Sequence, residues 1–324
     1  MPPRLWLRLK RVDQMGARRL VVESASLSLP AIAVHGGAGT WRLLEERGEE
    51  VRRPVHAALA GALEAGWDVL SRGGDALSAV VEAVALMEDS GLFNAGRGSV
   101  PTTAGAVEAD ASVMDGATRR FGGVCATTWP ANPVRAALAV SGLGGGPAPV
   151  LLAGAGADEV AMQAGLAPMP FLGRKVVPSG TPPSTPPSTP PDATTGTVGA
   201  VAVGPSGGLA AATSTGGLAG QRPGRVGDSA VAGAGTWADE TVAVSATGTG
   251  EAFILAGFAR RVAWSLRGGS GLEASLVAAI DAVVEWGGTG GTIAITPGGR
   301  LSMVFMTPAM ARGWRAGEGS SIEI

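Results

Sequence analysis

The residues with the clearest chemical potential are the threonines that follow a repetitive, proline-rich stretch. Residues 181–191 read TPPSTPPSTPP, and Thr194, Thr195 and Thr197 come soon after. A threonine hydroxyl is a weak nucleophile at neutral pH and needs a neighbouring base. Self-cleavage before a threonine would supply that base, because a free α-amine titrates at about 7.7 and accepts protons near neutral pH. A chain that cuts itself to expose a threonine would therefore meet this need, although a threonine that merely begins a strand is the alternative that the residues leave open.

Gly196 favours Thr197 as that nucleophile. Glycine adds no side chain beside the bond to be cut and tolerates strained backbone dihedrals. Thr197 also opens the string TVGAVAV, which has the composition of a buried strand. On the residues alone, Thr194 and Thr195 remain rivals.

Two charged residues form a second candidate site. Arg225 and Asp228 lie three apart in the turn-like string GRVGDS. An arginine can hold a carboxylate through two parallel hydrogen bonds, and an aspartate can hold an ammonium group. The pair matches the two charges of a free α-amino acid, although a local surface ion pair is the alternative that the residues leave open.

Glycine-rich strings offer two further interpretations. Thr247 and Gly248 end a predicted strand in TGTG, where a hydroxyl and backbone N–H groups suit an oxyanion hole. The string GGAG at 36–39 lacks both the Lys-Ser/Thr ending and the GxGxxG spacing of phosphate-binding loops, which argues against nucleotide binding.

Composition excludes several other classes. The 324 residues are 45% hydrophobic, with a formal net charge of −2 and only 16% charged residues, so no basic patch for nucleic acid or a membrane surface is expected. The single cysteine, Cys125, permits no intrachain disulfide and is predicted to lie in the core. With only His35 and His56 available, a histidine metal site is not expected. No apolar run approaches the ~20 residues of a membrane span and no signal peptide is recognisable, so a cytoplasmic location is predicted.

The elements that must position these residues follow from periodicity. Residues 1–30 are predicted to be a disordered extension, and the folded part is expected to begin at a buried strand over 31–34. Helical spacing predicts helices over 51–70 and from Asp75 to about Met87, and one helix over 251–266. Strands over 198–203 and 209–215 are predicted to form a hairpin. Residues 31–180 and 197–324 form two halves of one domain, joined by a disordered linker over 181–196.

Seven strings in this order resemble the plant-type L-asparaginase/isoaspartyl peptidase family of N-terminal-nucleophile (Ntn) hydrolases. They are AVHGGAG at 33–39, FNAGRGSV at 93–100, EADASVMDG at 108–116, GTVGAVAV at 196–203, TSTGG at 213–217, GRVGDS at 224–229 and TGTGE at 247–251. The resemblance covers almost the whole chain after residue 30. It implies an α/β (α+β) fold built as a four-layer αββα sandwich, an α chain and a β chain cut from one precursor, and an (αβ)₂ assembly.

The resemblance also assigns roles to single residues. It makes Thr197 the nucleophile, with Thr215 beside it, Asn94 in support, and Thr247 and Gly248 in the oxyanion hole. It gives Arg225, Asp228, Gly248 and Gly250 contacts with the substrate, and places the cut between Gly196 and Thr197. It requires no cofactor for catalysis, but it implies a structural Na⁺ held by the backbone carbonyls of Met87, Glu88, Ser90, Phe93, Ala95 and Arg97.

The predicted reaction is hydrolysis of L-asparagine and of β-aspartyl dipeptides through an acyl-enzyme on Thr197. Two alternatives remain open: a glycosylasparaginase-like amidase, and a non-catalytic aspartate-binding protein that never matures. No nucleic acid or membrane partner is expected.

Overall fold

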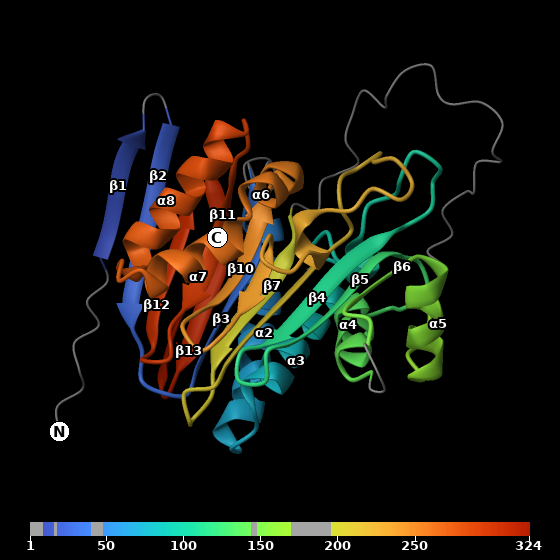
Figure 1. Cartoon of the computed structure of the whole chain (residues 1–324), viewed down its shortest axis with the longest axis horizontal. Coiled ribbons are helices and arrows are strands. Elements are labelled where there is room, and N and C mark those ends of the chain that lie inside the picture. Colours follow the sequence, from blue (N-terminus) through green and yellow to red (C-terminus); the bar gives the residue numbers. More distant parts are fainter. Residues whose placement is uncertain (1–8, 16–17, 40–47, 144–147, 170–195) are drawn as a thin grey trace.

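The computed structural model describes residues 9–15, 18–39, 48–143, 148–169 and 196–324. Nearly all of the predicted linker, 181–195, lies outside the described residues. The described elements mix helices and strands, which confirms the α+β class (Figure 1). The helices are α2 (Glu49–Ser71), α3 (Ala76–Ser90), α4 (Pro133–Ser141), α5 (Ala155–Gln163), α6 (Gly250–Ala256), α7 (Phe258–Arg267) and α8 (Leu272–Glu285), with short 3₁₀ turns η1 (Gly96–Gly98) and η2 (Asp228–Ala230).

The strands form two sheets. The six-stranded sheet has the order β1-β2-β12-β11-β10-β9, and the eight-stranded sheet has the order β14-β13-β3-β7-β8-β4-β5-β6. Pairing is antiparallel except between β5 and β6. The strands are β1 (Leu9–Met15), β2 (Arg18–Ser26), β3 (Ala31–Gly39), β4 (Ala109–Asp115), β5 (Arg120–Thr127), β6 (Leu151–Ala153), β7 (Val198–Val203), β8 (Leu209–Thr215), β9 (Thr236–Ala238), β10 (Ala243–Gly248), β11 (Gly290–Ile295), β12 (Arg300–Phe305), β13 (Ala309–Ala316) and β14 (Gly319–Glu323).

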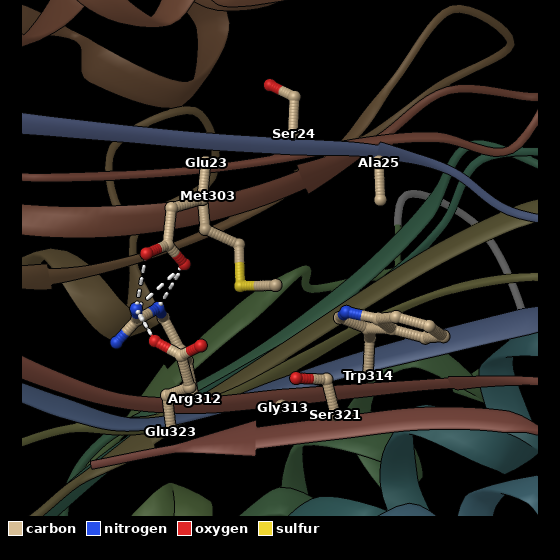
Figure 2. A pocket seen from close by; sticks show the side chains of 9 residues that line it. All are labelled: Glu23, Ser24, Ala25, Met303, Arg312, Gly313, Trp314, Ser321 and Glu323. Atoms are coloured by element: carbon tan, nitrogen blue, oxygen red, sulfur yellow. Dashed lines mark hydrogen bonds and ion pairs between the residues drawn. The ribbon is translucent and has the colours of Figure 1, made fainter. Parts of the chain in front are cut away.

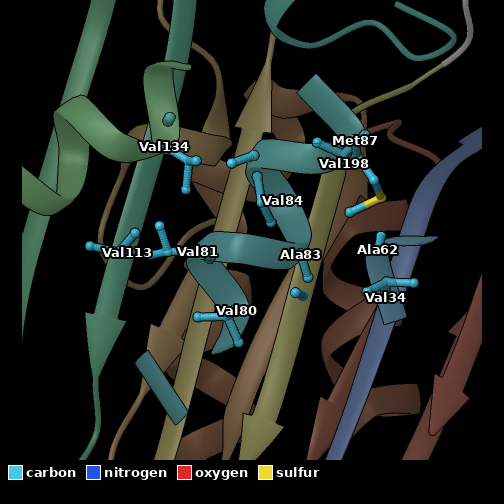
Figure 3. Packing of buried hydrophobic residues seen from close by; sticks show 14 of the residues in the cluster. Val34, Ala62, Val80, Val81, Ala83, Val84, Met87, Val113, Val134 and Val198 are labelled. Atoms are coloured by element: carbon cyan, nitrogen blue, oxygen red, sulfur yellow. The ribbon is translucent and has the colours of Figure 1, made fainter. Parts of the chain in front are cut away.

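Alternation of side chains along the strands creates separate cores. In β7, Val198, Ala200 and Ala202 face helices α2 to α5, whereas Val201 and Val203 face the other sheet. This is the two-residue period of a strand that is buried on both faces. Figure 3 shows the first of these cores, where the valines of α3 pack over the eight-stranded sheet. A third core lies between the six-stranded sheet and helices α6 to α8.

Local signals set the helix ends. The side chain of Asp75 accepts a hydrogen bond from the Ser78 N–H (2.7 Å), which confirms it as the N-cap of α3. The prediction of one helix over 251–266 is wrong, because Gly257 adopts a left-handed conformation (φ 56°) and divides the segment into α6 and α7. A valine- and alanine-rich pattern that continues past the glycine hides such a break.

The prediction that residues 1–30 lie outside the fold is wrong for β2. This strand pairs with β12 from Ser26 opposite Arg300 to Val21 opposite Phe305, and Leu20 is buried against the helices. Its Glu23 receives a bidentate hydrogen bond from Arg312 of β13, in the other sheet. Arg312 is 289 residues away from Glu23 in the sequence. The contacts that hold β2 in place are therefore not visible in the local sequence pattern.

A small cavity lies beside this ion pair, between the two sheets. It has a volume of about 100 Å³, and Figure 2 shows Arg312 between the carboxylates of Glu23 and Glu323 at one end and Trp314 at the other. Its lining contains none of the predicted site residues. The cavity is therefore a feature of the junction between β2 and the C-terminal strands.

Candidate active site

Thr197 and Thr215 lie at the same end of one hairpin. Strands β7 and β8 pair with Val198 opposite Ser214, so each threonine stands one residue beyond this pair. Thr215 in turn lies opposite Asp110 of β4. All three residues are buried. The sheet thus brings the predicted nucleophile, its predicted neighbour and a carboxylate to the same end of three neighbouring strands, β7, β8 and β4.

Gly196 holds the bond before Thr197 in a conformation that other residues rarely adopt. Its φ is 93°, and a Cβ atom there would stand 2.5 Å from the Cα of Gly37. The chain before the nucleophile therefore packs against the glycine-rich end of β3. Only glycine satisfies both the dihedral and the close approach.

Asp110 ties the charged turn to this hairpin. Its Oδ2 accepts a hydrogen bond from the N–H of Gly227 (2.7 Å), and its Oδ1 accepts one from the N–H of Ala126 (2.9 Å). Gly227 lies between Arg225 and Asp228, so one carboxylate fixes the backbone of the predicted substrate-binding turn. Burial raises the pKa of Asp110, while these hydrogen bonds and Arg225 oppose the shift.

Arg225 is paired with a carboxylate of the chain itself. Its Nε and Nη2 donate to the two carboxylate oxygens of Glu251, at 3.0 and 3.1 Å. The arginine side chain is 15% exposed and the glutamate 53% exposed, so the partner stands on the solvent side. Arg225 lowers the pKa of Glu251 by hydrogen bonding. The guanidinium is therefore oriented for a planar carboxylate and is held by one that belongs to the chain itself.

Asp228 is buried and incompletely paired. Its Oδ2 has no hydrogen-bond partner among the described residues, and burial raises its pKa to about 7 in spite of the nearby Arg225. Gly250 closes over the pair, since a Cβ atom there would lie 2.9 Å from Nη2 of Arg225 and 3.1 Å from Oδ1 of Asp228. An unpaired buried carboxylate is costly. A cationic group placed against it would relieve that cost.

Thr247 and Gly248 lie at the end of β10, in the other sheet, and face the same part of the site. Oγ1 of Thr247 accepts a long hydrogen bond (3.4 Å) from the N–H of Ala38, next to the glycine that contacts Gly196. Gly248 ends β10 opposite Gly290, with φ 151°. The two predicted oxyanion-hole residues therefore lie beside the segment of β3 that packs against Gly196. Asp228 begins η2, and Gly250 begins α6 two residues after Gly248.

Asn94 supports the turn that follows Thr215. Its Nδ2 donates to the carbonyl of Gly217 (2.6 Å), and its backbone carbonyl accepts from the N–H of Gly216 (2.8 Å). The N–H of Gly217 also donates to Oγ1 of Thr215 (3.1 Å). Asn94 thus acts on Thr215 through a turn that both residues hold.

The predicted Na⁺ ligands span the last turn of α3, the segment that follows it, and η1. Within this stretch, the carbonyl of Met87 accepts from Oγ of Ser90 (2.7 Å), and the carbonyls of Phe93 and Ala95 accept backbone N–H groups. The carboxyl of Glu88 accepts from Oγ of Ser214 (2.6 Å) beside Thr215, and burial raises its pKa to about 8. The other predicted carbonyls are those of Glu88, Ser90 and Arg97. Among the described residues, no group of three or more His, Cys, Asp or Glu side chains is placed to hold a metal ion.

Three residues of the site have no counterpart in the sequence-based predictions. Asp110 lies in the string EADASVMDG, and Glu251 in TGTGE, so the strings contained them without indicating their roles. His35 was considered only as a metal ligand in the sequence analysis. It contacts Thr197 directly, because its Nδ1 lies 3.1 Å from the carbonyl oxygen of Thr197. His35 and Thr197 come together because β3 pairs with β7.

Comparison with known proteins shows the family to which the chain belongs. The asparaginase family model matches residues 28–172 and 173–323. The chain is 41% identical over 299 residues to a plant-type L-asparaginase of Pyrobaculum calidifontis, covering 88% of this chain and 97% of that one. It is 39% identical to an isoaspartyl peptidase of Salmonella typhimurium (87% and 94% covered) and 38% identical to an isoaspartyl peptidase/L-asparaginase of Danio rerio (90% and 93%). The chain therefore belongs to the asparaginase family and is an enzyme of that family. In the parts of the chain that the structure describes, no helix has both the length and the apolar character to cross a membrane.

Proposed function

We propose that the chain cleaves itself between Gly196 and Thr197 and then hydrolyses the side-chain amide of L-asparagine and the isopeptide bond of β-aspartyl dipeptides. The observation that carries the proposal is the placement of Arg225 and a buried, incompletely paired Asp228 side by side next to Gly250, in a turn that Asp110 ties to the hairpin of Thr197. These two side chains match the α-carboxylate and α-ammonium of an aspartyl group. The names of the relatives support the same substrates.

The proposed reaction uses Thr197 twice. The freed α-amine takes the proton of the Thr197 hydroxyl as Oγ1 attacks the side-chain carbonyl carbon of the substrate. The resulting oxyanion receives hydrogen bonds from the Thr247 hydroxyl and the backbone N–H of Gly248. Collapse of this intermediate transfers the proton to the leaving amine and leaves an ester on Thr197. Water then attacks the ester and releases aspartate.

Neighbouring groups have supporting roles in this proposal. The Thr215 hydroxyl stands beside Thr197 and assists the proton transfer, while Asn94 holds the turn that carries it. Gly250 completes the substrate site next to Arg225 and Asp228. The three buried cores, one of them between the two sheets, support the four-layer αββα arrangement that the Ntn class implies. An (αβ)₂ assembly and a cytoplasmic location are further parts of the proposal.

A structural Na⁺ in the loop over 87–97 also belongs to the proposal. The carbonyls of Met87, Phe93 and Ala95 each accept a hydrogen bond, and a carbonyl oxygen has two lone pairs, so it can also bind a hard cation. The ion would neutralise carbonyl dipoles and stiffen the loop that carries Asn94, without taking part in the reaction.

A denaturing gel with N-terminal sequencing tests the proposal. We expect two fragments, the smaller one beginning TVGAV, and turnover of a β-aspartyl dipeptide and of L-asparagine. A single band with bound aspartate but no turnover would indicate a binding protein instead. Preferred turnover of glycosylated asparagine would indicate the glycosylasparaginase-like alternative, and a fragment that begins at Thr195 would refute the cut site.

A further inference from the structure

A chain of buried hydrogen bonds connects Thr197 to the charged turn through the centre of the molecule. Nε2 of His35 lies 2.9 Å from Oγ of Ser245, which lies 2.8 Å from Oγ1 of Thr213. Thr236 donates to the same Thr213 oxygen (2.6 Å). His35 lies in β3, and the three hydroxyl residues Ser245, Thr213 and Thr236 lie in β10, β8 and β9, so successive residues alternate between the two sheets. We call these three hydroxyl residues the hydroxyl network. His35 and the hydroxyl network are completely buried.

The backbone carbonyl of Thr197 sets the direction of this network. A carbonyl oxygen only accepts, so Nδ1 of His35 must carry the proton that it shares with Thr197. Nε2 is then the acceptor and must receive the hydroxyl proton of Ser245. Ser245 in turn accepts from Thr213, and Thr213 accepts from Thr236, so every hydroxyl donates toward the imidazole.

We propose that His35 is a positioning residue for the nucleophile, whose Nδ1–H holds the Thr197 carbonyl while the hydroxyl network fixes the imidazole from the opposite side. This inference rests on the proposed role of Thr197. The cut removes the residues before Thr197 but leaves its carbonyl in place, so the same contact orients the threonine before and after cleavage. Burial lowers the pKa of His35 to about 3, which keeps the ring neutral at working pH, and the Thr197 carbonyl selects the tautomer with the proton on Nδ1.

Two features show that the site is built around the ring. A Cβ atom on Gly199, which pairs with His35, would stand 2.0 Å from Oγ of Ser245 and 2.4 Å from Nε2 of His35. At its far end, Oγ1 of Thr236 also lies 3.2 Å from the carbonyl oxygen of Ser229, next to Asp228, so the single hydroxyl proton of Thr236 is shared between Thr213 and this carbonyl. One set of hydrogen bonds therefore ties the nucleophile and the ammonium-binding carboxylate to a common frame.

Substitutions of His35 separate positioning from general stability. In His35→Asn the amide nitrogen occupies nearly the place of Nδ1, because both atoms are bonded to Cγ, whereas His35→Leu removes the donor. We expect His35→Leu to slow self-cleavage and kcat by about 100-fold, since small misplacements of reacting groups cost rates of this order. His35→Asn should recover at least about tenfold of that loss. KM should change little, because Arg225 and Asp228 are untouched.

Gly199→Ala tests the same contact without changing the ring. It should resemble His35→Leu in kcat, while Ser302→Ala, which removes a buried hydroxyl pair with Ser24 elsewhere in the six-stranded sheet, should cleave and turn over normally. Equal losses in His35→Asn and His35→Leu, accompanied by equal losses in melting temperature and a raised KM, would reduce His35 to a packing residue and overturn the inference.

Histidine NMR provides a readout that does not depend on activity. The chain has only two histidines, and His56 is exposed on α2, so a ¹⁵N-histidine spectrum of Thr197→Ala precursor contains one buried ring and one internal reference. We expect the buried ring to carry its proton on Nδ1; a proton on Nε2 would refute the proposed direction. If Thr197→Ala retained turnover, the proposed function would fail. If Thr197 proved essential while His35→Leu matched the parent chain, only the present inference would fail.

Discussion

The nucleophile side and the substrate-binding side of the site differ in kind. On the nucleophile side, His35, Ser245 and Thr213 are neutral, buried and hydrogen-bonded to one another. On the substrate-binding side, Asp228 is buried with one oxygen unpaired, and Arg225 is held by an exposed carboxylate. A satisfied network fixes geometry, whereas an unsatisfied charge favours a ligand of opposite charge. In the proposed reaction, the fold thus orients the reacting group in advance, and the substrate completes the charges of the other side.

A side chain added at Gly196, next to the proposed cut, should have the largest effect, and it should act on the rate of self-cleavage. Gly196→Ala places a Cβ atom against Gly37 and forces alanine to φ 93°, a strain on the order of 1–3 kcal/mol besides the clash. We expect self-cleavage to slow by more than about 100-fold, as followed on denaturing gels. Gly207→Ala is a matched control, since Gly207 also has a positive φ (86°) but nothing nearer than 3.9 Å; equal cleavage rates in the two variants would contradict the role of crowding.

Arg225→Lys should damage the substrate-binding side alone. Lysine keeps the charge but loses the planar fork, and charge-assisted hydrogen bonds contribute about 1.5–3 kcal/mol. We expect kcat/KM for a β-aspartyl dipeptide to fall about 10- to 100-fold while self-cleavage proceeds. The exposed neighbour Arg222 provides the control Arg222→Lys. Blocked cleavage with unchanged KM would assign Arg225 to the nucleophile side instead.

Asp228→Asn should cost activity but gain stability. The folded-state pKa of Asp228, about 7, lies above its usual value of 3.8, so the folded chain binds more protons between these values and loses stability as pH rises from about 4 to about 7. In a Thr197→Ala background, the variant should therefore be more stable by about 1–3 kcal/mol at pH 8 and nearly equal at pH 4. Thermal melts at both pH values measure the difference, with exposed Asp68→Asn as the reference. A variant that is less stable at pH 8 would show that the carboxylate has a partner in the fold.

The smallest effect is expected for Glu251→Gln. This change removes the carboxylate that engages Arg225 in the absence of substrate, and an exposed pair of this kind contributes only about 0.2–1 kcal/mol. We expect KM to fall about two- to fivefold with kcat unchanged, as measured by steady-state kinetics. Glu240→Gln alters another exposed pair, with Arg119, and should leave KM as it is. A raised KM in Glu251→Gln would mean that Glu251 orients Arg225 for substrate rather than competing with it.

The sequence predicted the parts of the site that depend on local pattern. Two valine- and alanine-rich runs separated by a glycine-rich turn predicted the β7–β8 hairpin, and the hairpin by itself places Thr197 near Thr215. The spacing of Arg225 and Asp228 likewise placed them on one turn. It did not predict that Asp110 fixes this turn, because Asp110 and Gly227 are 117 residues apart.

The N-terminal strand shows the same limit in the fold. The alternating residues of β2 are too few to distinguish a strand from an extension, and its Glu23 has its partner Arg312 almost at the other end of the chain. Pairing with β12 buries β2. A buried ion pair offsets the cost of desolvating its two charges only when its geometry is good, as it is between Glu23 and Arg312.

By itself the sequence determined the β7–β8 hairpin, the helices α2 and α3 with the Asp75 cap, and the glycine before Thr197, since periodicity, capping and backbone freedom act within a few residues. Tertiary structure alone decided that His35 faces Thr197 and Ser245, which are 162 and 210 residues away. A histidine in a buried strand has no local signal for its partners. They are set by which strands pair and by the packing of one sheet on the other, where a buried ring must find hydrogen bonds with whatever the opposite face supplies.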